Sequence, residues 1–174
     1  MKRLILVCLA ALFLLSNCQK KEEPKVLTPF PDNSMALQSK ILQLEKLAKQ
    51  DPKNLNTWIE LGNSYMDTSR FPEAVNAYQK ALEIAPKNVD VRVDLGTCYR
   101  SSGQPEKAAE EYRKAISINP SHPNAHRNLG IVLAFDLKNK QGAITEFEEY
   151  LRLVPNAPDT QKISQLVEEL KKSA

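Results

Sequence analysis

Residues 58–65 have the sequence WIELGNSY, and related stretches follow at 92–99 and 126–133, each 34 residues after the one before. Every one of these stretches has leucine followed by glycine at its fourth and fifth positions. A fixed period of this length indicates a solenoid, in which one supersecondary unit is stacked on further copies of itself.

Further recurring positions extend the match over nearly the whole period. They are Trp58, Leu61, Gly62, Tyr65, Ala74, Tyr78, Ala81 and Pro86 in the first copy; Arg92, Leu95, Gly96, Tyr99, Ala108, Tyr112, Ala115 and Pro120 in the second; and His126, Leu129, Gly130, Leu133, Ala143, Phe147, Tyr150 and Pro155 in the third. The third copy is one residue longer between Leu133 and Ala143. We place its extra residue near Lys138 to Gln141.

Each copy is predicted to form a helix, a tight turn and a second helix. Proline is tolerated in the first turn of a helix and ends a helix elsewhere, so Pro72 and Pro105 open second helices and Pro86 stops one. Glycine inside a helix costs about 1 kcal/mol relative to alanine, so Gly62 and its equivalents need a reason. We expect a close approach of the second helix, with small residues such as Ala74 opposite and tyrosine rings filling the seams between hairpins.

Two flanking segments are predicted to cap the stack. Residues 35–52 have apolar side chains three or four apart and match the second half of a repeat, which predicts an N-terminal capping helix. Residues 158–174 predict an amphipathic C-terminal capping helix, with Ile163, Leu166, Val167 and Leu170 on one face. Terminal repeats need such caps because their outer apolar side is otherwise exposed.

The recurring pattern resembles the tetratricopeptide repeat (TPR). The resemblance implies an all-α fold, a right-handed solenoid of three helix-turn-helix repeats at 55–88, 89–122 and 123–157. The departures are Arg92 and His126 in place of the first aromatic residue, and Tyr150 in place of a small one.

Residues 1–17 are predicted to be a signal peptide. Lys2 and Arg3 precede an apolar stretch shorter than the roughly 20 residues that span a bilayer; an uncleaved membrane anchor is the alternative. Residues 15–18 resemble the lipobox of bacterial lipoproteins, which implies lipidation (palmitate among the acyl chains) of Cys18. In similar lipoproteins of two-membrane bacteria, aspartate after the cysteine favours retention at the inner membrane, so Gln19 at this position implies an outer-membrane anchor facing the periplasm. Residues 18–34 are then the lipidated cysteine and a disordered tether rich in lysine, glutamate and proline.

Charge gives no argument for nucleic acid as a partner. Without residues 1–17 the chain has 22 basic and 21 acidic side chains. Cys8 leaves with the signal peptide and Cys18 would be acylated, so no disulfide framework is expected. Cys98 is then expected to be a buried packing residue.

In the TPR family, ligands lie mostly in a concave groove lined by the first helices. Carried over to this chain, the groove positions are Asn56, Ile59, Asn63 and Met66; Asp90, Val93, Thr97 and Arg100; and Asn124, Arg127, Ile131 and Ala134. Arg100 and Arg127 are suited to holding a carboxylate or backbone carbonyls. The alternative is that these are ordinary solvated positions. Ile59 and Val93 stand where the chaperone-tail-binding TPR proteins place lysine, which argues against that ligand.

Little in the chain points to catalysis. His122 and His126 are four residues apart, but no third metal ligand accompanies them. The sequence also has no glycine-rich phosphate loop and no paired-cysteine motif. We therefore expect no enzyme activity, no metal and no cofactor.

The resulting hypothesis is a protein-protein interaction scaffold or adaptor, lipid-anchored in the bacterial cell envelope, which binds an extended peptide or a partner protein. Two alternatives stay open. One is an assembly factor similar to the repeat domains that hold apocytochromes during cytochrome c maturation, and the other is a structural linker from the outer membrane to the cell wall. The sequence leaves the oligomeric state open.

Overall fold

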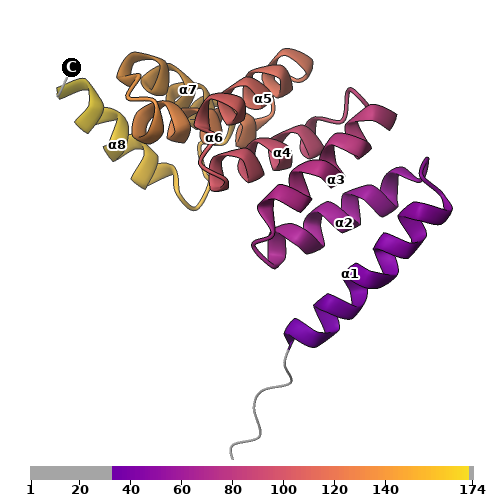
Figure 1. Ribbon diagram of the computed structural model, residues 1–174. Coiled ribbons are helices and arrows are strands. Elements are labelled where there is room, and N and C mark those ends of the chain that lie inside the picture. The colour runs from indigo at the N-terminus through magenta and orange to yellow at the C-terminus, as the bar shows by residue number, and fades with distance from the viewer. Residues whose placement is uncertain (1–32, 173–174) are drawn as a thin grey trace, which may run out of the picture. The chain divides into compact units, whose positions relative to one another are not determined.

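The computed structural model describes residues 33–172, which form a curved stack of antiparallel helices (Figure 1). The elements are α1 (Asn33–Gln50), α2 (Leu55–Asp67), α3 (Phe71–Ile84), α4 (Val89–Ser101), α5 (Pro105–Ile118), α6 (Pro123–Ile131), the π-helical turn η1 (Val132–Asp136), α7 (Lys140–Leu153) and α8 (Thr160–Lys172). No strand occurs in this range. The predicted all-α solenoid is confirmed. The predicted signal peptide, lipobox and tether lie outside the described residues.

The helices pair as three hairpins: α2 with α3, α4 with α5, and α6 with α7. The N-termini of α2, α4 and α6 are capped at positions 34 residues apart, because the side chains of Asn54, Asn88 and His122 each accept a hydrogen bond from the backbone N–H three residues on. Such caps satisfy amides that have no partner within the helix. The period therefore extends to the residues that start each hairpin.

The turns inside the hairpins also repeat. Ser69, Gly103 and Lys138 all have positive φ, at 57°, 72° and 56°. Left-handed backbone favours glycine, yet serine and lysine adopt the same conformation here. The third turn therefore keeps its geometry although it has no glycine.

The extra residue of the third repeat lies in η1, so its predicted place near Lys138 to Gln141 is wrong. Three residues separate Tyr65 from Ser69, whereas four separate Leu133 from Lys138. The added residue widens the last turn of the first helix, where the amide of Leu137 donates to the carbonyl of Val132, five residues back. π-Helical structure is rare and occurs mostly as single turns inside α-helices, frequently at functional sites.

The helical glycines lie against aromatic rings. A Cβ at Gly62 would lie 2.5 Å from the ring of Tyr78, and Gly96 and Gly130 meet Tyr112 and Phe147 in the same way. The expected close approach is thus found, but the second helix fills it with the aromatic ring instead of a small alanine surface. The ring therefore locks the two helices of one hairpin together.

The capping segments complete the apolar core. In α1, Ile41, Leu44 and Ala48 are buried and the helix packs on α2, whereas Leu47, three residues after Leu44, is exposed. In α8, Ile163 and Val167 are buried and the helix packs on α7. These contacts cover both ends of the three hairpins.

Candidate functional site

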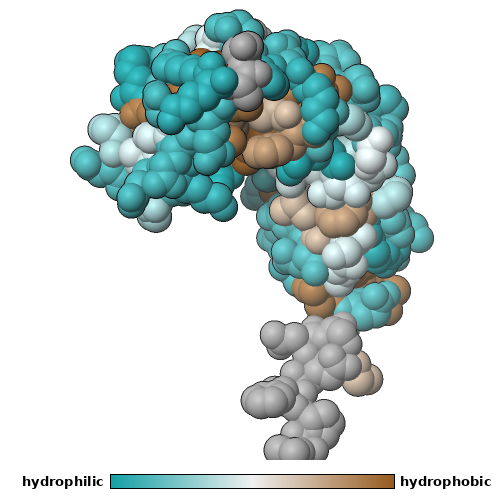
Figure 2. Space-filling view, turned by 90° about the vertical axis from the view of Figure 1, so that its left-hand side faces the viewer, coloured by the Kyte–Doolittle hydropathy of each residue, from teal (hydrophilic) through white to brown (hydrophobic). Residues whose placement is uncertain are grey.

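The candidate site lies on the inner side of the curved stack. In Figure 1, α4, α6 and α8 follow this side, and α5 and α7 lie on the other. Figure 2 shows a hollowed face on which apolar residues gather, surrounded by a mostly hydrophilic surface. First helices of neighbouring hairpins thus supply the groove that the TPR resemblance implies.

A pocket of about 480 Å³ occupies the C-terminal half of this groove. Arg100 of α4 and Arg127 and Ile131 of α6 line it together with Phe135 of η1. The opposite wall comes from α8, through Lys162, Ile163, Gln165, Leu166 and Glu169. Three predicted groove residues, one from the second repeat and two from the third, are therefore brought to one cavity.

A smaller cavity of about 130 Å³ adjoins the first. It shares Arg100, Arg127 and Ile131 with the larger pocket and adds polar groups from Thr97, Tyr112 and Asn128. The Thr97 hydroxyl lies 3.1 Å from that of Tyr112. The larger cavity is therefore partly apolar, whereas the smaller one offers hydrogen-bonding groups.

Both predicted arginines are held by aspartates of this chain. The Nε group of Arg100 donates to Asp136 at 2.5 Å, and that of Arg127 donates to Asp159 at 2.5 Å. The Tyr150 hydroxyl also donates to Asp159. This hydrogen bond and the guanidinium of Arg127 hold the pKa of Asp159 below its usual value. The arginines are therefore oriented donors whose charge is already balanced.

The predicted positions in α2 are less concentrated. Asn56 is exposed and Ile59 and Met66 are half-buried, and none of the three lines either groove cavity. The Asn63 side-chain oxygen accepts a hydrogen bond of 2.6 Å from Tyr78. The first repeat therefore offers an open surface.

Four other predicted positions differ in how accessible they are to a ligand. Val93 is 6% exposed and belongs to the core, so it is not accessible to a ligand. Asp90 accepts a hydrogen bond of 2.9 Å from Nε2 of His122, whose Nδ1 caps α6. Asn124 is exposed at the start of α6, and Ala134 is buried.

A carboxylate that the sequence did not single out lies beside Asp90. Asp94 is half-buried in α4, and burial, reinforced by the negative charge of Asp90, raises its pKa to about 6. His122 acts in the opposite direction. Asp94 therefore titrates near neutrality.

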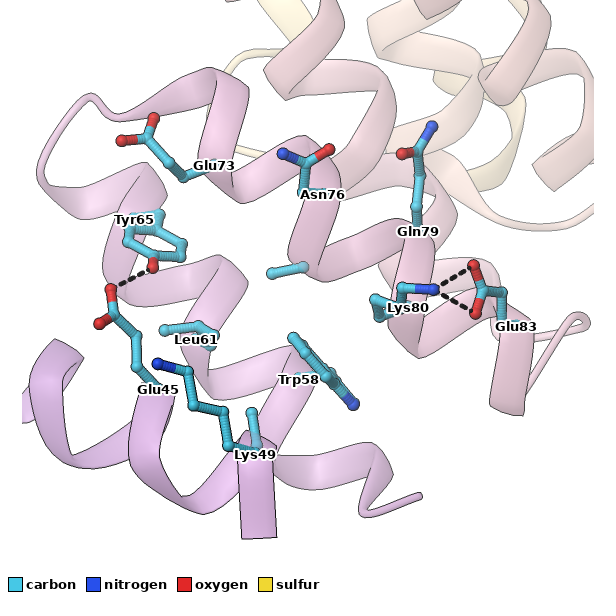
Figure 3. A pocket seen from close by; sticks show the side chains of 12 residues that line it. Glu45, Lys49, Trp58, Leu61, Tyr65, Glu73, Asn76, Gln79, Lys80 and Glu83 are labelled. Atoms are coloured by element: carbon cyan, nitrogen blue, oxygen red, sulfur yellow. Dashed lines mark hydrogen bonds and ion pairs between the residues drawn. The ribbon is translucent and has the colours of Figure 1, made fainter. Parts of the chain in front are cut away.

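Figure 3 shows a second hollow of about 520 Å³, between α1, α2 and α3 and outside the predicted groove. Trp58, Leu61 and Tyr65 form its apolar and aromatic surface. Its charged groups are largely paired with each other or with neighbours: Glu45 accepts from Tyr65 at 2.6 Å, and Lys80 contacts Glu83 at 2.8 Å. The lining gives no clear preference for a ligand of either charge.

The remaining candidates for chemistry have structural roles in this fold. Cys98 is fully buried, which raises the pKa of its thiol to about 12. His126 contacts Glu146 at 2.6 Å, away from His122 and its partner Asp90. Residues 33–172 contain no cluster of three or more metal-binding side chains. In the same range, no helix combines the length and apolar character needed to cross a bilayer.

The sequence did not predict Phe135, Lys162, Ile163 and Leu166 as pocket residues. Phe135 lies in η1, a π-helical turn that the 34-residue period does not predict. The residues of α8 were assigned to a cap, although an amphipathic helix after the third hairpin occupies the place of a fourth first helix. The position of this helix in the stack could therefore have identified the α8 residues as part of the pocket.

Solved structures of several TPR proteins have the same fold. The crystal structure of MamA superposes with a TM-score of 0.73, at 22% identity over 80% of this chain and 81% of MamA. The Sgt2 TPR domain from Aspergillus fumigatus has a TM-score of 0.61, at 27% identity over 68% and 78%. The first TPR of Spaghetti (RPAP3), solved with the HSP90 peptide SRMEEVD, has a TM-score of 0.60, at 24% identity over 68% and 96%.

No curated protein sequence matches the chain. A family model does match, over residues 31–161, and its range includes all three hairpins and the arginines of the groove. The chain therefore belongs to the family of the cytochrome c-type biogenesis protein H TPR domain.

Proposed function

We propose that this protein is a non-enzymatic adaptor of the bacterial cell envelope that binds an extended segment of a partner protein in its groove. The observation that carries the proposal is the pair of adjoining cavities along α4, α6 and α8, one partly apolar and one polar, with Arg100 and Arg127 between them. An extended chain presents side chains and amide groups in alternation, and this combination of surfaces suits both.

The proposal includes a lipid anchor at Cys18, with residues 1–17 as the signal peptide and the domain facing the periplasm from the outer membrane. Its support is the sequence pattern at positions 2–18. Stable membrane anchoring needs more than one hydrophobic signal, and several acyl chains on one cysteine meet this requirement. Metabolic acyl labelling of the wild type and of Cys18→Ser tests this part, because equal labelling of both would exclude Cys18 as the modified residue.

A more specific candidate role is the assembly of c-type cytochromes. The family match over residues 31–161 favours it, since that family is named for cytochrome c-type biogenesis. In this role the bound segment belongs to an apocytochrome. This role is tested by measuring the affinity of the protein for haem-free apocytochrome c, with the haem-loaded cytochrome as the control. Equal affinity for both would argue against this role.

Site-specific cross-linking tests the binding function itself. The photoreactive residue p-benzoylphenylalanine is placed at Asn128 in the groove and, as a control, at Ile118, which is 37% exposed on α5. We expect a discrete cross-linked protein from position 128 in cells and none from position 118. The absence of any cross-linked polypeptide from position 128 and from other groove positions would refute peptide binding in the groove.

A further inference from the structure

We propose that η1 makes the larger groove cavity selective for a large uncharged apolar side chain inside an extended segment, in preference to a terminal carboxylate. This inference rests on the proposed function, because it assigns a ligand to the same groove. It depends on the register of the third repeat, on the apolar lining and on the pairing of the charges.

The segment that contains the insertion, η1, places an aromatic ring in the groove. If Phe135 is taken out of the sequence, Asp136 falls in line with Asp67 of the first repeat and Lys138 with Ser69. The insertion therefore lies at or next to Phe135, which is 49% exposed in the wall of the cavity. The matching segments of the other two repeats, residues 66–68 and 100–102, contain no aromatic residue, so the aromatic wall is particular to the third repeat.

The surroundings of Phe135 favour an apolar guest. Ile131 lies on the same helical segment, and Ile163 and Leu166 face the cavity from α8. Burying a leucine or phenylalanine side chain against such a lining is favourable, because it removes apolar surface from water. The cavity of about 480 Å³ has room for one such side chain.

The charges of the cavity argue against a carboxylate ligand. Arg100 is paired with Asp136 and Arg127 with Asp159, so an incoming carboxylate must compete with two carboxylates already in place. The other lining charges, Lys162 and Glu169, are opposite in sign. A neutral side chain requires no such exchange.

Each pairing hydrogen bond uses Nε of an arginine, and the guanidinium also has two terminal NH₂ groups. These groups are suited to donating to backbone carbonyls of a ligand. Thr97 and Asn128 in the adjoining small cavity add further hydrogen-bonding groups. The guest side chain in the large cavity and its neighbouring amides in the small one match the alternation of an extended chain.

The test uses the full-length chain and a positional-scanning library of fluorescent nonapeptides that are N-acetylated and C-amidated. Sub-libraries have leucine, phenylalanine, alanine, lysine or glutamate fixed at the central position. Fluorescence anisotropy is expected to show the tightest binding for the leucine and phenylalanine sets. Peptides with a free C-terminal carboxylate are expected to bind no more tightly than their amides.

Phe135→Ala should reduce the affinity for the leucine and phenylalanine sets at least fivefold and weaken the preference over alanine. Ile118→Ala is the matched control, because it also removes a partly exposed apolar side chain but from α5. Thermal unfolding followed by circular dichroism checks that both variants are folded.

Tighter binding of the glutamate set or of free carboxylates, an unchanged preference in Phe135→Ala, or no binding of any set to the wild type would overturn the inference. Cross-links at position 128 together with any of these results would leave the groove function intact and refute only the selectivity. If position 128 gives no cross-links and no peptide set binds the wild type, the groove function is refuted as well.

Discussion

Arg92 and Glu111 form an ion pair of 2.6 Å between α4 and α5, with only 13% and 11% of their side chains exposed. The same two positions hold Trp58 and Ala77 in the first repeat and His126 and Glu146 in the third. His126 contacts Glu146 at 2.6 Å. The two positions therefore change together, either as an aromatic residue with alanine or as a nitrogen base with a carboxylate.

The first member of each pair also makes a second, shared contact. Nε1 of Trp58 donates to the carbonyl of Pro52 at 2.9 Å, and Arg92 donates to that of Pro86 at 2.7 Å. Nε2 of His126 lies 2.9 Å from the carbonyl of Pro120. Three different side chains thus tie the start of each hairpin to the proline that ends the preceding helix. This common role explains how arginine and histidine replace the usual aromatic residue.

The pairing predicts a double-mutant result. Glu111→Ala should lower the free energy of unfolding by about 3 kcal/mol, because it leaves the charge of Arg92 nearly buried without a counter-ion. Arg92→Trp combined with Glu111→Ala recreates the pair of the first repeat and should recover most of that loss. Urea denaturation measures both, with Glu110→Ala, which removes an exposed carboxylate, as a control expected to cost less than about 1 kcal/mol. A double variant no more stable than Glu111→Ala would contradict this account.

The hairpins were predictable because their signals are local. Leucine next to glycine, the turn positions and the helix-ending prolines each act within a few residues, so the period of 34 carries the fold. The balanced charges of the groove were not predictable in this way. Arg100 meets Asp136 and Arg127 meets Asp159 across more than 30 residues of sequence, and the first of these contacts depends on η1.

The position of the inserted residue also could not be predicted from the sequence. Lys138 occupies the left-handed position that Gly103 marks in the second repeat, so no glycine identifies the third turn. Val93 was assigned to the groove by its position in the repeat, yet it packs into the core. Packing between neighbouring helices determines whether such a position is buried, and the 34-residue period alone does not reveal that packing.

Gly62→Ala should destabilise the protein although alanine is the better helix former. Its Cβ would lie 2.5 Å from the ring of Tyr78, which is fully buried and cannot move aside. We expect a loss of about 1 to 3 kcal/mol, as for other overpacked cores. Gly142→Ala is the comparison, because its Cβ would meet only the side chain of Asn139 at 3.0 Å. Equal effects of the two changes in urea denaturation would contradict the proposed role of the ring.

Asp94 should make the stability of the fold depend on pH. Its folded pKa of about 6 lies above the ordinary 3.8, so the folded state binds a proton more tightly than the unfolded state does. The resulting stabilisation is complete below about pH 4 and is lost as the pH rises through about 6. Asp94→Asn should therefore raise the free energy of unfolding by about 1 to 2 kcal/mol at pH 7.5 and by much less at pH 4. Asp67→Asn, which removes an exposed carboxylate from α2, is the control, and a gain for Asp94→Asn that does not change with pH would rule out the titration of this group as its cause.

Deleting Phe135 should separate the fold from the groove pocket. The deletion restores the 34-residue period, so a regular helical turn can replace η1 and reach the turn at Lys138 in the register of the first two repeats. We expect the helix content by circular dichroism to be retained and the free energy of unfolding to change by less than about 1 kcal/mol, because Phe135 is half exposed. Binding of the leucine and phenylalanine peptide sets should fall at least as far as in Phe135→Ala. A deletion variant that unfolds at a much lower urea concentration would show instead that the π-helical turn is needed for the packing of α7 on α6.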